Sequence, residues 1–169
     1  MKKSLLVAII ALVCGTMAYA QPRAIGVNLG GGTGFSYQHG FGESNMLDID
    51  VHTSLMHAVH GWWGVGAHVT YDWIDPFGAK FPELEKGVFN WAMGVGASGG
   101  LYSFSYGYWY AGVAGHVGVA YDFWFPLELS LDWRPSIGIY NGGTHAIDFN
   151  HWGLFDGISL GVRYRFGQK

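Results

Sequence analysis

Histidine, aspartate, glutamate and arginine side chains recur along the chain at positions where they could transfer protons or hold ions. The candidates are Asp48, Asp50, His52, His68, Asp72, His116, Asp122, Glu128, Asp132, Arg134, Arg163 and Arg165. Such a set could form an ion-conducting path or a catalytic acid–base group. It could equally form a polar core, because the five N–H donors of one arginine can satisfy several carboxylates. The choice depends on the elements that carry these side chains.

Other chemistry-bearing patterns are weaker. The loop histidines His57, His60, His145 and His151 could form a surface metal site. The spacing His57-x-x-His60 alone is not specific, so we predict neither a metal site nor a cofactor. The glycine-rich run 30–34 lacks the lysine of a phosphate-binding loop and is interpreted as a hairpin turn.

The first 20 residues have the layout of a secretory signal peptide. Lys2 and Lys3 precede the apolar run 5–13, and Ala18-Tyr19-Ala20 is a small-x-small cleavage site. We expect Sec-dependent export, cleavage after Ala20 and one mature domain spanning 21–169. The only cysteine, Cys14, lies in the leader, so the mature domain is expected to contain no disulfide.

Composition excludes several classes of protein. The sequence contains 28 glycines, 17% aromatic residues and only 12% charged residues. Few charges and many aromatics exclude a disordered linker, and so much glycine disfavours helices. Without Lys2 and Lys3 the domain keeps seven basic residues against 12 acidic ones, so it offers no surface for nucleic acid.

Apolar residues alternate with small or polar ones through most of the domain. This period of two predicts eight strands separated by turns. The strands are expected at 25–29, 35–37, 45–55, 63–73, 89–101, 109–123, 127–137 and 158–166. The turns are expected at 30–32, 40–44, 56–61, 74–87, 102–108, 124–126 and 140–153. The longer strands match a tilted strand that crosses a bilayer in about ten residues.

The second face of each strand distinguishes a membrane barrel from a soluble one. A face toward water should carry Lys, Glu, Thr and Arg, but here it is mostly Gly, Ala and Ser with sparse charges. Small residues suit a narrow interior where opposite walls meet. We therefore predict an all-β fold, an eight-stranded antiparallel up-and-down transmembrane β-barrel.

This fold favours the polar-core interpretation, because eight strands leave an interior that side chains fill. With both termini periplasmic, Asp48, Asp50, Asp72, Asp122 and Glu128 are expected to meet Arg163 and Arg165 at one depth. The remaining candidates, His52, His68, His116, Asp132 and Arg134, are expected nearer the middle.

The last strand contains polar, glycine and aromatic residues in a pattern that resembles the signal recognised by the barrel assembly machinery. Its residues are Ser159, Gly161, Tyr164 and Phe166, although the tail 167–169 departs from proteins that end at the aromatic. With segments 24–27, 35–39 and 124–135, it resembles the outer membrane protein beta-barrel domain family of Gram-negative bacteria. The resemblance implies the outer membrane as location, with its lipid and the assembly machinery as partners, and no defined activity.

We predict a structural or interaction role, with loops available to an extracellular ligand, and two alternatives stay open. Some barrels of this size are lipid A-modifying acyl hydrolases with a His and a Ser two positions apart facing lipid. His52 and Ser54 have this spacing, but the alternation along the strand places them on the inner face with Asp50. His39 is expected on the outer face but has no serine partner on that face. The second alternative is a narrow pore. The loop 74–87 is long for a periplasmic turn, which indicates a partner-binding loop or a wrong strand assignment.

Overall fold

The computed structural model describes residues 22–31, 33–42, 44–53, 64–76, 81, 84–103, 107–141, 147–150 and 157–166. The predicted signal peptide, Ser54, the four loop histidines and the tail 167–169 lie outside these residues. In the described ranges, no helix is long and apolar enough to cross a membrane.

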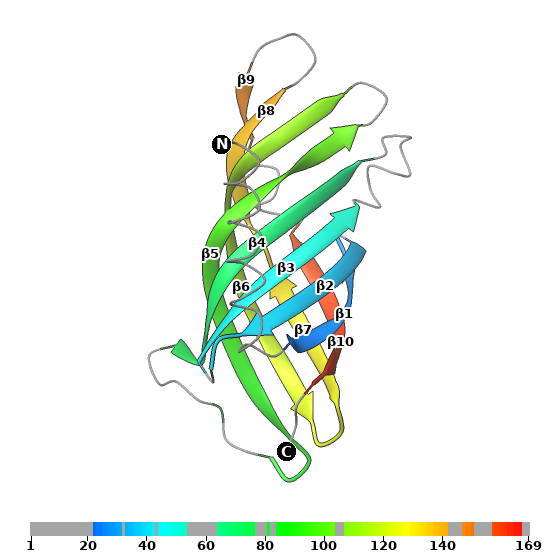
Figure 1. Cartoon of the computed structure of the whole chain (residues 1–169), viewed down its shortest axis with the longest axis vertical. Coiled ribbons are helices and arrows are strands. Elements are labelled where there is room, and N and C mark those ends of the chain that lie inside the picture. Colours follow the sequence, from blue (N-terminus) through cyan, green and yellow to red (C-terminus); the bar gives the residue numbers. More distant parts are fainter. Residues whose placement is uncertain are drawn as a thin grey trace, which may run out of the picture.

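Ten β-segments form one continuous sheet (Figure 1). They are β1 (Pro22–Gly30), β2 (Thr33–Gly40), β3 (Asn45–Thr53), β4 (Val65–Ile74), β5 (Gly87–Ser103), β6 (Tyr108–Phe123), β7 (Leu127–Trp133), β8 (Ser136–Asn141), β9 (Ile147–Asn150) and β10 (Ile158–Arg165). Neighbours pair in the order β5-β4-β3-β2-β1-β10-β7-β6, and the pairing of β5 with β6 closes the ring. The predicted all-β, eight-stranded antiparallel barrel is confirmed.

Segments β7 and β8 are two halves of one wall strand, because both pair with β6. Pro135 separates them, since proline has no N–H for the ladder. The backbone bridges the break: Arg134 N donates to Gly157 O at 2.9 Å, and Gly115 N donates to Pro135 O at 2.8 Å.

The predicted turn 140–153 is wrong. Strand β8 runs to Asn141, and β9 pairs with it in antiparallel register, Ile139 opposite Phe149. Period two continues through β9, where Ile147 and Phe149 alternate with Asp148 and Asn150. The seventh and eighth wall strands are therefore longer than predicted.

The two ends of the barrel differ. At the terminal end, where β1 begins and β10 ends, Phe166 N donates to Arg23 O at 3.0 Å. At the opposite end, here called the loop end, β5, β6, β8 and β9 extend past the β1–β2 hairpin (Figure 1). Gly42 and Gly107 lie in turns at opposite ends and have φ of 76° and 66°, a conformation that favours glycine.

The long connection between β4 and β5 follows from strand stagger. Ile74 at the end of β4 pairs with Ala92, whereas β5 begins at Gly87 and pairs there with Phe123. The five residues 87–91 extend β5 by about 17 Å beyond β4. The connection from β4 to β5 must cover that distance, which explains why the loop 74–87 is long. Its length is therefore consistent with the predicted strands on either side.

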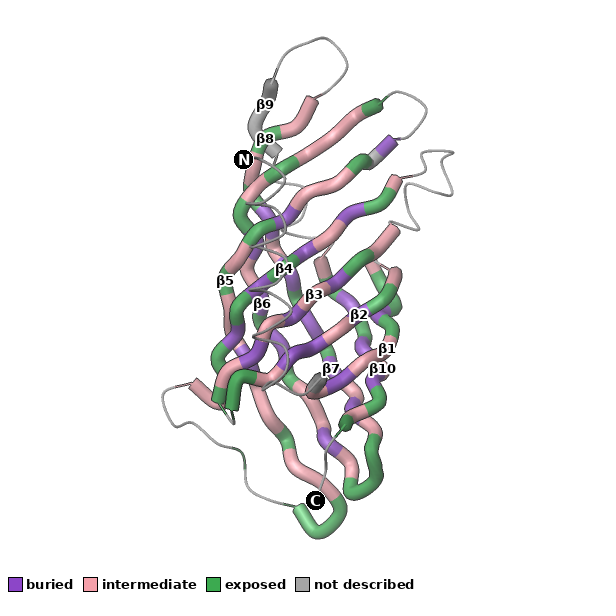
Figure 2. Tube along the Cα trace, in the orientation of Figure 1, coloured by how far each residue is buried: buried purple, intermediate pink, exposed green. Residues whose placement is uncertain are grey.

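Buried and exposed residues alternate along the strands (Figure 2). In the described part of the chain, 20 polar or charged residues are buried, against four apolar ones, Ala24, Met46, Ala92 and Ala114. Twenty-seven large apolar residues are exposed, most of them on the outside of the same walls. The barrel is thus polar within and apolar without.

Candidate functional site

Arg163 on β10 occupies the centre of the interior polar network and is 1% exposed. Its guanidinium makes five hydrogen bonds to side chains of β1, β2 and β7. The acceptors are Ser36 (2.8 Å), Asn28 (3.0 Å), Asp132 (2.8 Å), Glu128 (3.0 Å) and Ser130. The number of contacts equals the number of N–H donors of one arginine. Buried charge is therefore fully compensated at this position.

A second group of charges closes the terminal end. Arg23 donates to Glu128 Oε2 at 2.8 Å, and Arg165 Nη1 lies 3.1 Å from Asp122 Oδ2. Asn90 also donates to Asp122 at 2.6 Å. The side chains of Arg23 and Arg165 are each 18% exposed. This group is the boundary between the buried network and solvent at that end.

A third group lies between β3, β4, β6 and β7. His116 Nδ1 lies 2.7 Å from Asp72 Oδ2, and its Nε2 lies 3.2 Å from Asp132 Oδ1. Arg134 approaches Asp48 at 3.4 Å and Asp132 at 3.5 Å, both long contacts. His116 is therefore held between two carboxylates, and Arg134 is held loosely.

Toward the loop end, Asn28 donates to Asp50, and His52 Nδ1 lies 2.8 Å from Asp50 Oδ1. The rings of His52 and His68 are 4.8 Å apart. His68 pairs across the strands with Asp50 on one side and Ser98 on the other. In the part of the chain that the structure describes, His68 Nδ1 and Ser98 Oγ have no hydrogen-bond partner. The row Asp50–His68–Ser98 is consequently not connected as an acyl-transfer triad.

Two glycines make room for these side chains. A Cβ at Gly94 would collide with the carboxylate of Asp72, and one at Gly118 would overlap Asp132 Oδ1. Both glycines face inward from strands that carry larger side chains elsewhere. Glycine is thus needed where an acidic side chain from a neighbouring position fills the space.

A cavity of about 20 Å³ lies beside the network, lined among others by Arg23, Gln38, Met46, Trp91 and His116. This volume has room for about one water molecule.

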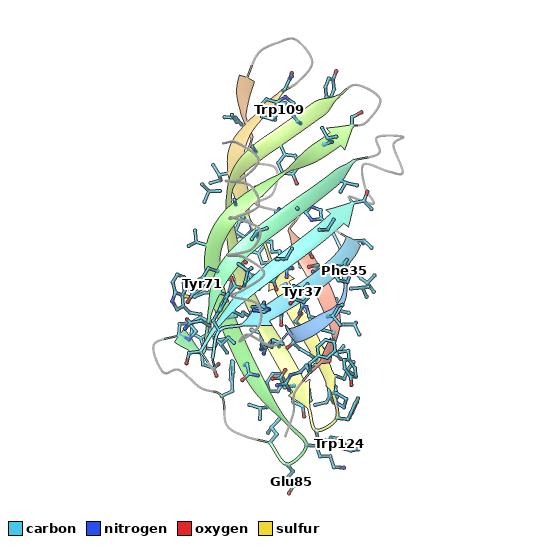
Figure 3. The ribbon with its side chains drawn as sticks, in the orientation of Figure 1. Phe35, Tyr37, Tyr71, Glu85, Trp109 and Trp124 are labelled. Carbon is cyan, nitrogen blue, oxygen red and sulfur yellow. The ribbon has the colours of Figure 1, made fainter. Side chains whose placement is uncertain are left out.

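The outer surface carries aromatic residues near both ends. Tyr71 and Trp124 lie toward the terminal end, and Trp109 lies near the loop end (Figure 3). At the terminal end the rings form three groups of mutual contacts, here together called the aromatic belt. Its members are Phe41, Tyr71, Trp73, Phe81, Phe89, Tyr121, Phe123, Phe125, Tyr164 and Phe166.

His39 also lies on the outer face, and no serine of the described ranges is hydrogen-bonded to it. Tyr37 OH lies 3.0 Å from His39 Nδ1, and the ring of Phe41 packs edge-on against the imidazole. These neighbours leave His39 only 6% exposed.

All the predicted network residues point to the inner side, but their depths differ from the prediction. Glu128 meets Arg163 and Asp122 meets Arg165, as expected. Asp48, Asp50 and Asp72 do not meet either arginine: they bond to Arg134, His52 and His116. The expected single depth is wrong, because strand stagger distributes these acids along the barrel axis.

Several members of the network were not predicted from the sequence. Four of them lie at alternate strand positions that face inward, so the period of two could have predicted them. They are Asn28, Ser36, Gln38 and Ser130. Arg23 could not, because the β1–β2 register shifts between Pro22 and Ala24, and this bulge changes which face the side chain reaches.

Comparison with known proteins finds no matching family model, no matching curated protein and no matching solved structure.

Proposed function

We propose that the chain is an integral outer-membrane β-barrel protein with a structural or interaction role. The reversed burial pattern is the observation that carries this proposal: charged side chains such as Arg163 and Glu128 are buried, whereas Val113 and Leu131 are 61% and 59% exposed. In water this arrangement would forfeit the hydrophobic contribution that holds a soluble domain together. In lipid it gives each face its preferred surroundings.

Strand length supports a bilayer-spanning wall. β4 has ten residues, which corresponds to about 33 Å of extended chain. Tilted by about 45°, such a strand spans about 23 Å, close to the apolar band of outer-membrane barrels. The aromatic belt lies at one limit of this band, where Trp and Tyr rings prefer the lipid–water interface.

The seam between first and last strands supports insertion by the barrel assembly machinery. β10 pairs with β1 along its whole length, from Ala24 opposite Arg165 to Gly30 opposite Ser159. Tyr164 and Phe166 point outward and are 53% and 41% exposed. Strand addition of this kind uses backbone pairing for affinity and alternate side chains for recognition.

The interior favours a closed barrel over a narrow pore. Arg163 connects β10 to β1, β2 and β7 on one side of the lumen, and Arg134 contacts Asp48 on β3 across it. These charge pairs would have to break before an ion could pass, and breaking a buried pair is costly.

The interior also gives little support to a lipid-modifying enzyme. His52 is bonded to Asp50 inside the barrel, away from an acyl chain on the outer surface. Outward His39 is bonded to Tyr37 and covered by Phe41.

Membrane fractionation followed by electrophoresis in SDS with and without heating tests the proposal. The expected result is a membrane-bound protein whose unheated form migrates differently from its boiled form. Recovery of an unaggregated protein in detergent-free buffer would contradict it. Single-channel recording in planar bilayers separates the closed barrel, which should give no discrete conductance steps, from the pore.

A further inference from the structure

Three buried side chains with metal-binding groups converge in the middle of the barrel. Asp48 on β3, Asp72 on β4 and His116 on β6 each place one ligand atom within 4.8 Å of the others. They are 1%, 0% and 2% exposed. No such convergence was expected from the sequence, where these residues are 24 and 44 positions apart.

Asp72 is incompletely satisfied. Its Oδ2 lies 2.7 Å from His116 Nδ1, but its Oδ1 is buried without a hydrogen-bond partner among the described residues. A buried carboxylate oxygen without a partner carries the full cost of desolvation. A cation bound to Oδ1 of Asp72 would remove that cost.

The imidazole of His116 has the surroundings of a metal ligand. Its Nε2 lies 3.2 Å from Asp132 Oδ1, while Nδ1 faces Asp72. Metal-ligating histidines generally donate their other ring N–H to a carboxylate, which fixes the tautomer and the ring orientation. Asp132 would be this orienting carboxylate, leaving Nδ1 for the ion.

The charge of the interior is consistent with a divalent ion. The described inward side chains include six carboxylates, those of Asp48, Asp50, Asp72, Asp122, Glu128 and Asp132. Four arginines lie among them, Arg23, Arg134, Arg163 and Arg165. One divalent cation would cancel the excess of two negative charges.

We propose that Asp48, Asp72 and His116 form a Zn²⁺ site inside the barrel. Two carboxylates and one imidazole suit zinc, which takes three protein ligands and a water in a tetrahedral shell. Calcium would need about six to eight oxygens, and magnesium would need a nearly octahedral shell. The neighbouring cavity, which His116 and Asp132 line, has a volume of about 20 Å³ and can supply the single water.

Binding requires side-chain movements. Ligand atoms of a tetrahedral zinc ion lie about 3.3–3.6 Å apart, since zinc–ligand distances are about 2.0–2.2 Å. Atoms separated by up to 4.8 Å must therefore approach by about 1 Å, whereas Asp72 Oδ2 and His116 Nδ1, 2.7 Å apart, must separate. The contacts of Asp48 that must adjust are a 3.1 Å hydrogen bond from Gln38 and a 3.4 Å contact with Arg134. The proton on His116 Nδ1 passes to solvent as the ion takes its place. The ion then joins β3, β4 and β6 across the lumen, whether or not the barrel lies in a membrane.

Calorimetric titration and thermal unfolding test the site. The untagged, folded protein is stripped with EDTA in detergent and titrated with ZnCl₂, with MgCl₂ and CaCl₂ as comparisons. The expected result is one Zn²⁺ per chain and a higher unfolding temperature, with no effect of the other two ions. D72N should lose saturable binding, whereas D122N, a buried acid outside the cluster, should keep it. Absence of Zn²⁺ binding by the wild type, or unchanged binding by D72N, would overturn the proposal.

X-ray absorption at the zinc edge provides a test that needs no variant, in case D72N does not fold. The zinc-loaded wild type should show a shell of oxygen and nitrogen with a single imidazole. Two or more imidazoles would place the ion on other histidines and refute the site.

Discussion

Arg163 and Glu128 lie opposite each other on adjacent strands β10 and β7, and Nη1 of Arg163 donates to Oε1 of Glu128 at 3.0 Å with both side chains at 0% exposure. A buried arginine with five acceptors cannot be removed without leaving carboxylates uncompensated. The interior network is therefore the part of the structure whose stability is most sensitive to single changes.

We predict that Arg163→Met lowers the free energy of unfolding by about 3–5 kcal/mol, the usual cost of breaking a buried ion pair. Arg165→Met is the matched control. Its side chain is 18% exposed and pairs with Asp122 at the terminal end, so its loss should be about 1 kcal/mol or less. Urea unfolding in detergent measures both. Equal losses for the two variants would argue against a central role for Arg163.

Gly94→Ala should destabilise the barrel by about 1–3 kcal/mol, because the new Cβ overlaps the carboxylate of Asp72 and overpacks the interior. Gly99→Ala, on the same strand, should change stability by less, since its nearest contact is Tyr110 O at 3.3 Å. The two variants can be compared by the temperature at which the unheated electrophoretic band is lost. A reversed order would mean that Asp72 does not fill the space in front of Gly94.

Val69→Arg should destabilise the barrel in lipid by about 2–4 kcal/mol, the cost of a cation near the bilayer midplane. Val69 is the fifth residue of β4 and is 39% exposed. The control is Leu84→Arg, at a position 50% exposed next to the turn at the terminal end. Folding titrations into vesicles give the difference. On a water-facing surface neither substitution would have a substantial effect, so equal stabilities would contradict a lipid-facing β4.

Tyr164→Ala and Phe166→Ala together should reduce the folded fraction in cells while leaving refolding into detergent nearly unchanged. The reason is that these side chains point outward from the closing strand and make few interior contacts. Tyr121→Ala, elsewhere in the aromatic belt, controls for the loss of an interfacial ring. If Tyr121→Ala reduces assembly as strongly as the double variant, the last strand has no special part in assembly.

Alternation of residue types predicted the strands and the side of the barrel on which each side chain lies, since period two is a property of neighbouring residues. Depth was not predictable in this way. Asp48 and Arg134 come together across the lumen from β3 and the β7–β8 junction, and such a contact depends on the stagger accumulated over intervening strands. Arg23 was missed for a related reason: the bulge at residues 22–24 breaks the alternation of inward and outward side chains.

Strand β9 was missed because it is only four residues long and lies between segments without a clear period. The extent of β5 beyond β4 was equally hidden, because strand length shows in a sequence but the relative offset of two strands does not. Offset is set by cross-strand pairs such as Ile74 with Ala92.

Spin labels at two consecutive residues of β5 give the most direct test of the barrel's orientation toward lipid. Ala97 points outward and is exposed, whereas Ser98 points inward and is 7% exposed. In vesicles, a label at Ala97→Cys should collide freely with oxygen and be protected from a water-soluble nickel chelate, as expected in acyl chains. A label at Ser98→Cys should be protected from both reagents. Contact of the nickel chelate with the label at position 97 would contradict the account, because the apolar face would then be in water.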